Sequence, residues 1–254
     1  MENVLQAAKD LAASRHAVAL TGAGISVESG IPPFRGKGGL WEKIDPMEYA
    51  HIEALRRNPE AVWRVLIQDM KTTLDTARPN DGHTGLAQLE KMGILKTIIT
   101  QNVDGLHQLA GSRHTIEFHG SFAWMRCMNC SNRIETRYLD ISVIPPRCAC
   151  GGIWRPECVF FGEEIPPRCL IDSKHAAMSC DVMLVVGTSA EVQPAAYMPV
   201  IAKNRGATII EINPEKTALT RSVSDYIIRG KAGEVMNGIL SALNQIRSSA
   251  PVDG

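Results

Sequence analysis

One stretch decides the fold of this chain: Ala17-Val-Ala-Leu-Thr-Gly-Ala-Gly-Ile-Ser-Val-Glu-Ser-Gly-Ile-Pro-Pro-Phe-Arg-Gly36. Its first part is apolar and β-branched and stops at Gly22-Ala23-Gly24, which is typical of a buried parallel strand entering a tight turn. A helix is expected to start at Ser26, where free backbone N–H groups and the positive dipole end would favour a pyrophosphate. Five residues separate Gly24 from Gly30, unlike the dinucleotide fingerprint, so the glycines alone also fit an ordinary strand–turn–helix corner.

The second part of the stretch is rich in glycine and proline and carries an aromatic ring and a fixed cation, Phe34 and Arg35. It is predicted to be a loop beside the turn, where functional residues are common. Together with Thr100-Gln-Asn-Val-Asp-Gly-Leu-His107 and Phe118-His119-Gly120, the stretch resembles the sirtuin family of NAD-dependent protein deacylases. The resemblance covers nearly the whole chain, and three separate motifs in the same order make it specific.

The composition limits the classes of partner and compartment. Lysine plus arginine number 27 and aspartate plus glutamate 27, so no general positive field attracts the chain to nucleic acid or anionic membranes. The N-terminus has a polar, helical pattern, and no apolar run reaches membrane-spanning length. The 7 cysteines are clustered, which favours a reducing compartment and metal ligation over a disulfide framework. We therefore expect a cytoplasmic protein that binds neither nucleic acid nor a membrane.

Helical and extended patterns alternate along most of the chain, which predicts an α/β fold with a doubly wound, Rossmann-like parallel sheet. Helices are predicted over 4–12, from Asn58-Pro59 onward, over 86–92 and over 232–246, and strands over 96–100, 181–186 and 207–212.

Two insertions interrupt this alternation. The insertion at 36–76 is helical, and the insertion at 121–157 carries four cysteines and few long apolar runs. We expect the two to pack as one smaller domain against an NAD-binding domain made of 1–35, 77–120 and 158–254. The cleft between the two domains would then be the active site.

Four cysteines form two close pairs, Cys127-Met-Asn-Cys130 and Cys148-Ala-Cys150. Two such pairs fit a tetrahedral tetrathiolate zinc site in a ribbon-like module. A closed site has no open position for water, so the zinc would be structural. The second pair departs from the family pattern, which usually has two intervening residues. A metal-free ribbon is one alternative, and Cys158 in place of one member of the tight pair is another.

The resemblance implies catalytic roles for His119, Asn102 and Asp104. His119 would be the general base, because an imidazole titrates near neutral pH and can take a proton from a ribose hydroxyl. Gln101 and Asn102 would orient the nicotinamide ribose. Asp104 would accept a hydrogen bond from the carboxamide of nicotinamide or from the backbone that supports it. Asn102 and Asp104 also fit a plainer interpretation, since both residue types form side-chain-to-backbone bonds in turns at strand ends.

The same resemblance implies an NAD site along the ends of the predicted strands. Ile31 and Phe34 would form apolar walls, and Arg35 would hold a phosphate or the loop, or else be a surface charge. Pro33 stands where the family commonly has Asp or Thr. The implied cofactor-binding residues are Gly22, Ala23, Gly24, Ser26, Ile31, Phe34, Arg35, Gln101, Asn102, Asp104, Gly187, Thr188, Ser189, Asn213, Lys231 and Ala232.

An acyl-lysine peptide or protein is the partner that the resemblance implies. The run Val159-Phe160-Phe161-Gly162-Glu163 resembles the family's peptide-binding loop, and Val192 lies in a second segment. An extended peptide would add between the two as a strand, through backbone bonds that depend little on side chains. Cys158 stands where the family more often has a small or aliphatic residue. So does Glu157, for which the sequence offers no physical account.

The implied reaction consumes NAD as a co-substrate. The acyl-lysine amide oxygen attacks the nicotinamide ribose carbon as nicotinamide leaves, and His119 then activates a ribose hydroxyl that takes the acyl group. Mono-ADP-ribosyl transfer to protein is the alternative among enzymes, and a non-catalytic NAD-sensing protein is the alternative outside them. The intact polar residues at Asn102, Asp104 and His119 favour deacylation. The glycine spacing disfavours a dehydrogenase.

One predicted helix bears on which acyl group is removed. Family members that prefer succinyl or malonyl groups carry a tyrosine and an arginine three residues apart, just after a tryptophan. Here the helix reads Trp63-Arg-Val-Leu-Ile-Gln-Asp69, with Leu66 at the tyrosine place and Asp69 at the arginine place. An acyl carboxylate would face a leucine and a second carboxylate without a compensating cation. We therefore expect a deacetylase that also accepts longer apolar acyl groups.

Overall fold

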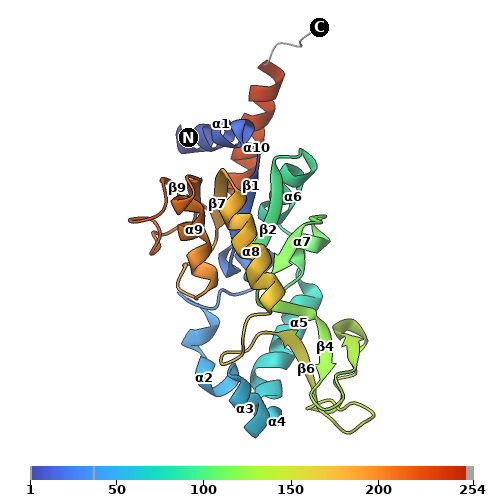
Figure 1. Ribbon diagram of the computed structural model, residues 1–254. Coiled ribbons are helices and arrows are strands. Elements are labelled where there is room, and N and C mark those ends of the chain that lie inside the picture. Colours follow the sequence, from blue (N-terminus) through green and yellow to red (C-terminus); the bar gives the residue numbers. More distant parts are fainter. Residues whose placement is uncertain (1, 37, 250–254) are drawn as a thin grey trace.

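A computed structural model describes residues 2–36 and 38–249, and Figure 1 shows its two β-sheets. The strands of the larger sheet are β1 (Ala17–Thr21), β2 (Leu95–Thr100), β3 (Thr115–Glu117), β7 (Val182–Val186), β8 (Thr208–Ile212) and β9 (Tyr226–Ile228). Their order is β3-β2-β1-β7-β8-β9, and every neighbouring pair is parallel. The order reverses between β1 and β7, so the predicted Rossmann-like sheet is confirmed.

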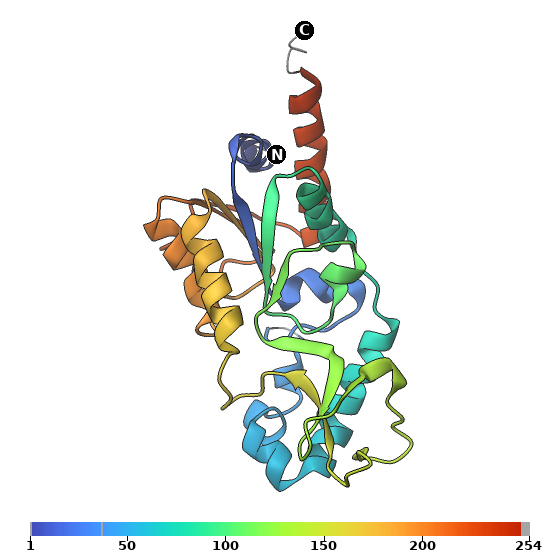
Figure 2. The same cartoon turned by 45° about the vertical axis from the view of Figure 1, so that its right-hand side comes forward.

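Helices cover both faces of this sheet, as Figures 1 and 2 show. Ala19 and Leu184 belong to one hydrophobic core, and Leu20 and Val185 belong to the core on the opposite face. Because both faces are covered, β1 and β7 are buried at every position, which explains why β7 and residues 17–20 of β1 are apolar throughout. The first core also contains residues of α1 (Glu2–Ala13), α6 (Asp81–Lys91) and α10 (Ala232–Ser249), and the second residues of α8 (Pro167–Ser179), η5 (Ala195–Tyr197) and α9 (Met198–Asn204).

The turn after β1 differs from the prediction. A 3-10 helix, η1 (Ala23–Ser29), starts directly after Gly22 and ends at Gly30, whose φ is 83°. The predicted helix start at Ser26 is therefore wrong, and Ser26 is buried inside the helix. The helix begins earlier because Gly22 has no side chain and can turn closely against the end of β7.

A smaller lobe occupies the lower part of the molecule in Figures 1 and 2. Its antiparallel sheet, in the order β5-β4-β6, consists of β4 (Gly120–Cys127), β5 (Arg133–Glu135) and β6 (Trp154–Cys158). Its helices are η2 (Leu40–Glu42), α2 (Pro46–Tyr49), α3 (Ile52–Arg57), α4 (Pro59–Val62), the π-helical η3 (Trp63–Ile67), α5 (Gln68–Thr76) and η4 (Thr136–Tyr138). One core joins the two sets: Trp63 packs with Phe122 and Trp154, and its Nε1 donates to Trp154 O at 2.9 Å.

Local sequence signals set several helix ends. Asn58 caps α4 and is followed by Pro59 at the first helical position. Asn80 and His83 form a capping box at the start of α6, and Gly93, with a φ of +75°, follows its end. Among residues 2–36 and 38–249, no helix combines the length and the apolar character needed to cross a bilayer.

Candidate active site

A cleft of about 1030 Å³ opens along the C-terminal ends of the parallel strands. Gly22 after β1, Gln101 after β2 and Thr188 after β7 line it, together with Leu66 of the smaller lobe and Phe160 of the loop after β6. Ligands of doubly wound sheets bind in this position, outside the point where the strand order reverses. The cleft is therefore the candidate site.

Two turns meet at the floor of the cleft, where β1 and β7 end. Gly24 N–H donates to Gly187 O at 2.7 Å, which brings the two backbones into contact. A Cβ atom on Gly22 would lie 2.7 Å from Thr188 Cβ, and one on Gly24 would lie 2.7 Å from Gly187 Cα. Gly187 has a φ of +62°, which favours glycine. The result is a floor of bare backbone that a phosphate group can approach closely.

Asn102, in the loop after β2, connects this floor to a buried polar network. Its Nδ2 donates to Gly22 O at 3.2 Å and to Ser26 Oγ at 3.1 Å. Ser26 Oγ donates in turn to Asp104 Oδ2 at 2.7 Å, and His83 Nε2 lies 3.3 Å from the same hydroxyl. The structure thus brings three of the predicted residues together, with Ser26 in the centre.

His119 lies between β3 and β4, at the junction of the two lobes, and lines the cleft. Its Nδ1 is 3.0 Å from Gln101 O. A carbonyl oxygen can only accept, so Nδ1 carries the proton and Nε2 keeps a free lone pair. Burial lowers the pKa of His119, and the bond to Gln101 opposes this shift without cancelling it. At neutral pH the ring is therefore an uncharged imidazole that can accept a proton.

The Gly/Pro-rich loop after η1 forms an aromatic wall of the cleft. Phe34 stacks on Trp41 with ring centroids 5.3 Å apart, and the Trp41 and Phe161 centroids are 6.3 Å apart. Trp41 N–H donates to Phe34 O at 3.0 Å and closes the loop. Arg35 is exposed, and its Nε lies 3.6 Å from Glu191 Oε2.

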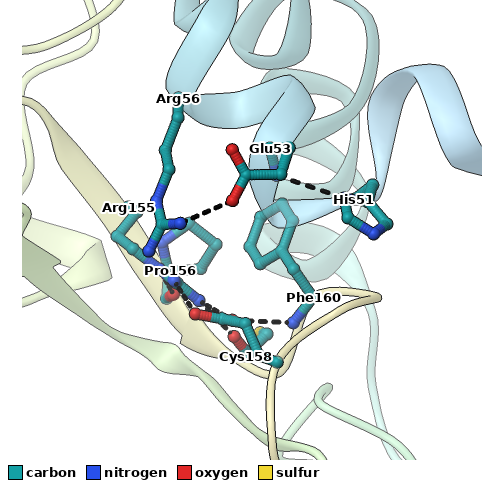
Figure 3. Close-up of polar contacts among 8 residues, drawn as sticks. His51, Glu53, Arg56, Arg155, Pro156, Cys158 and Phe160 are labelled. Atoms are coloured by element: carbon teal, nitrogen blue, oxygen red, sulfur yellow. Dashed lines mark hydrogen bonds and ion pairs between the residues drawn. The ribbon is translucent and has the colours of Figure 1, made fainter.

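Arg155 of β6 fixes the loop that follows it, as Figure 3 shows. Its guanidinium donates to both carboxylate oxygens of Glu163, at 2.6 and 2.8 Å, and to Cys158 O at 2.6 Å. The guanidinium carbon lies 4.7 Å from the centroid of the Phe160 ring, and the Arg155 side chain is only 7% exposed. Burial alone would raise the pKa of Glu163, but the bonds from Arg155 and from Phe160 N–H lower it. Glu163 is therefore ionised and paired.

The same loop connects the site to the helices of the smaller lobe. Phe161 N–H donates to Ala50 O, and Phe161 O accepts from Ile52 N–H, each at 2.9 Å. Val159 N–H donates to His119 O at 2.9 Å. The loop predicted to bind peptide thus lies between His119 and the helical segment.

Glu157 also has a physical account in the structure. Its Oε2 pairs with Arg133 NH2 at 2.6 Å. Glu157 belongs to β6 and Arg133 to β5, so the pair reaches across the central strand of the small sheet.

The four paired cysteines meet in the smaller lobe. In a tetrahedral zinc–thiolate site the sulfur atoms are about 3.8 Å apart. The Sγ atoms of Cys127 and Cys150 are 3.5 Å apart, and those of Cys130 and Cys148 are 3.7 Å apart. All four lie within 4.8 Å of one another, so they fit a structural zinc ion. Gly151, with a φ of +84°, allows the tight turn that the one-residue spacing requires.

Comparison with known proteins agrees with this arrangement. Residues 22–194, more than half of the chain, match the Sir2 family. This chain belongs to the Sir2 family. The predicted resemblance to sirtuins is therefore confirmed.

Other proteins of known name and other solved structures match this Sir2 protein over nearly its whole length. NAD-dependent protein deacylase 1 of Archaeoglobus fulgidus is 48% identical over 233 residues, which cover 91% of this chain and 94% of the relative. The NAD-dependent protein deacylase of Pyrococcus furiosus is 47% identical over 247 residues, covering 95% and 98%. An ADP-ribose complex of a mutant Sir2 homologue has a TM-score of 0.92 and 45% identity, covering 97% of this chain and 98% of that chain.

Most of the predicted ligand-binding residues of this Sir2 protein line the cleft. Three of the predicted cofactor-binding residues, Ser26, Ile31 and Asp104, lie outside the lining of the cleft, as the described part of the chain shows. The predicted residues that line it are Gly22, Ala23, Gly24, Phe34, Arg35, Gln101, Asn102, His119, Val159, Phe160, Phe161, Gly162, Glu163, Gly187, Thr188, Ser189, Val192, Asn213, Lys231 and Ala232.

Sequence reasoning missed a buried group behind the cleft. His107, in α7 (Leu106–Leu109), places Nε2 2.9 Å from Thr21 Oγ1, which donates to Thr100 Oγ1 at 2.9 Å. Burial lowers the pKa of His107 to about 3, and the nearby His83 ring contributes. His107 is therefore neutral and connects α7 to β1. Its place in the motif 100–107 was the signal that could have revealed this contact.

The apolar wall of the smaller lobe corrects one step of the acyl-group argument. Leu66, Ile67 and Met70 line the cleft, while Asp69 is exposed and, within the described residues, outside the lining. The expectation that Asp69 faces an acyl group is therefore wrong. On a helix of 3.6 residues per turn, Leu66, Ile67 and Met70 lie within about 100° of one another, and Asp69 lies about 60° outside that face.

Proposed function

We propose that this Sir2 protein is an NAD-dependent protein lysine deacetylase, which transfers the acyl group of acyl-lysine to ADP-ribose with release of nicotinamide. One observation carries the proposal. A single cleft holds the glycine floor at the strand reversal, His119 with a free Nε2, and the 159–163 loop. The activity in the names of its relatives supports the same reaction.

In the proposed reaction NAD is a co-substrate, and the protein orients it. The glycine floor binds the pyrophosphate, and Gln101 and Asn102 hold the nicotinamide ribose. Asp104, held by Ser26, supports the nicotinamide pocket from behind. The amide oxygen of acyl-lysine displaces nicotinamide from the ribose carbon. His119 Nε2 then takes the proton of a ribose hydroxyl, whose oxygen attacks the acyl carbon. The lysine nitrogen takes up a proton and leaves as free lysine, and a water molecule adds to the acyl carbon, so that the acyl group stays on that ribose oxygen.

Zinc would be held by Cys127, Cys130, Cys148 and Cys150. Four thiolates leave no coordination position for a substrate, so the zinc would have a structural role and would cross-link the small sheet. The hydrophobic core shared by the 36–76 and 121–157 insertions supports their assignment to one domain, with 1–35, 77–120 and 158–254 as the other.

The proposed partner is an acyl-lysine peptide that adds as a strand between the 159–163 loop and Ser189–Val192, both of which line the cleft. A myristoylated histone peptide is bound to Sir2Af2, which is 38% identical to this chain with a TM-score of 0.81, covering 98% of this chain and all of that chain. The clustered cysteines support a cytoplasmic protein. The equal numbers of acidic and basic residues support the absence of direct affinity for nucleic acid.

The first test is release of nicotinamide. We expect release above a slow hydrolytic background only when both NAD and an acetyl-lysine peptide are present, because the peptide supplies the nucleophile. Mass spectrometry should find acetylated ADP-ribose in an amount equal to free lysine peptide. Equal nicotinamide release without peptide would favour NAD hydrolysis or ADP-ribosyl transfer instead.

The pH dependence of turnover should reflect the buried state of His119. Because the base must be unprotonated and burial lowers its pKa in the free protein, kcat/KM should rise with pH and level off, with the midpoint below the ordinary value of 6.5. The measurement is kcat/KM for NAD between about pH 5 and 8. Circular dichroism over the same range controls for unfolding. A midpoint above 6.5 would contradict the assignment.

Acetyl should be preferred over succinyl on one peptide sequence. Leu66, Ile67 and Met70 offer apolar contacts but no cation, so a desolvated acyl carboxylate has no partner there. We expect kcat/KM for deacetylation to exceed that for desuccinylation by at least about tenfold. Leu66→Arg should narrow this ratio, whereas Asp69→Arg, at an exposed position, should not. An equal or higher value for the succinyl peptide in the wild type would contradict the proposal.

A further inference from the structure

Glu211 carries a fully buried carboxylate. It belongs to β8, and its exposed fraction is 0%. Its neighbours in the strand, Ile210 and Ile212, are apolar and buried. A carboxylate loses most of its hydration in such a place, so it persists only where donors replace the lost water.

Three hydroxyl groups replace that water. Thr217 Oγ1 donates to Glu211 Oε1 at 2.5 Å, and Thr220 Oγ1 and Ser224 Oγ donate to Oε2 at 2.8 Å each. All three donors come from the connection between β8 and β9. Bonds to an ionised acceptor are stronger than those between neutral groups, so this single side chain holds the connection at three points.

The connection depends on these bonds for its shape. Within the described residues, no helix or strand occurs between Ile212 and Tyr226. Thr220 Oγ1 also accepts from Thr217 N–H at 2.9 Å, and Leu219 between them is buried. The hydroxyls that reach Glu211 are therefore also part of the turns that fold the connection.

The first half of the connection forms a wall of the cleft. Residues 213–218 line it beside Gly230–Ala232, and Asn213 Nδ2 donates to Thr188 O at 3.1 Å. This wall lies on the β8 side of the strand reversal, while Asn102 and His119 lie on the β2 side. A dinucleotide lies across the reversal, so the end remote from the nicotinamide rests against residues 213–218.

We propose that Glu211 is a positioning residue that sets the affinity of the cleft for the adenosine end of NAD, by holding the 213–224 connection through three hydroxyl groups. The inference rests on the proposed function for the identity of the dinucleotide. Glu211 does not line the cleft; it acts through Thr217, Thr220 and Ser224.

The test compares two serines of the connection by the same substitution. Ser224→Ala removes a hydroxyl that reaches Glu211, whereas Ser222→Ala removes an exposed one whose bond goes to Ala218 O at 3.3 Å. We expect Ser224→Ala to raise the Kd for NAD and for ADP-ribose by about fivefold to tenfold, and Ser222→Ala to leave both unchanged. Isothermal titration of the folded proteins, without peptide, gives these values directly.

Glu211 itself is tested by two substitutions that remove its acceptor oxygens to different degrees. Glu211→Gln keeps the shape and one acceptor oxygen, so it should raise the NAD Kd less than Glu211→Leu, which removes every acceptor. In turnover, KM for NAD should rise while kcat at saturating NAD and KM for the peptide stay within about twofold. General destabilisation would not produce this division between the two KM values. Should Glu211→Leu fail to fold, Thr220→Val and Ser224→Ala carry the same test.

The outcomes separate the two proposals. Equal NAD and ADP-ribose affinity in wild type, Ser224→Ala and Glu211→Gln would overturn the role of Glu211, whatever the reaction. Wild-type protein that binds NAD but removes no acyl group would overturn the proposed deacetylation, while the binding comparison would still decide the role of Glu211. Wild-type protein that binds neither NAD nor ADP-ribose would overturn both.

Discussion

Replacing His119 with alanine is expected to lower kcat by about two to four orders of magnitude, the usual effect of losing a general base. The Nε2 lone pair of His119 is free because Nδ1–H is committed to Gln101 O at 3.0 Å. The substitution removes the acceptor for the ribose proton. The glycine floor and the 159–163 loop keep their own backbone contacts. NAD and peptide affinities should therefore change little, as measured by titration calorimetry beside steady-state kinetics.

A second histidine provides the control. His114 is 71% exposed and pairs with Glu90 at 2.6 Å. His114→Ala makes the same chemical change and should retain the wild-type kcat. Wild-type turnover by folded His119→Ala protein would remove His119 from the mechanism.

The second large effect is expected for Arg155→Met. This substitution leaves the Glu163 carboxylate, which is 25% exposed, without its cation, and removes the donor to Cys158 O. Breaking such a pair costs about 2 to 4 kcal/mol in the free energy of unfolding. Because the pair fixes the 158–163 loop, KM for the acyl-peptide should also rise by about tenfold or more, while NAD affinity changes less. Urea unfolding and steady-state kinetics measure the two effects.

The small sheet contains a matched control for this variant. Arg133 and Glu157 pair at the same 2.6 Å distance, but the Arg133 side chain is 51% exposed. Arg133→Met should therefore cost only about 0 to 1 kcal/mol and leave the peptide KM unchanged. Equal losses in the free energy of unfolding of the two variants would show that burial of Arg155 does not strengthen its ion pair. If Arg155→Met does not fold, Glu163→Gln tests the same pair.

Local patterns in the sequence predicted much of the fold. Apolar runs predicted the buried strands β1 and β7, because a strand covered on both faces is buried at every position. Asn58 and Pro59 marked the start of a helix, since capping depends on the residues at the terminus itself. The cysteine spacing predicted a metal site, and the four sulfur atoms lie within 4.8 Å of one another.

The errors arose where a contact between distant segments overrides a local rule. Ser26 looked like a helix start, but it is buried inside η1 and bonded to Asp104, 78 positions away in the chain. Asp69 was expected to face the acyl group from spacing on a regular helix. Asp69 instead lies outside the face on which Leu66, Ile67 and Met70 line the cleft, and it is exposed.

The sequence by itself determined the family, the alternation of strands and helices, and the positions of the glycines and cysteines, because each follows from neighbouring residues. Only the tertiary structure decided which groups meet. Arg155 and Glu163 lie 8 positions apart and Asn102 and Gly22 80 apart, and no periodic pattern links either pair. The three hydroxyls on Glu211 were likewise invisible, because serine and threonine in a turn look the same whether water or a buried carboxylate accepts their protons.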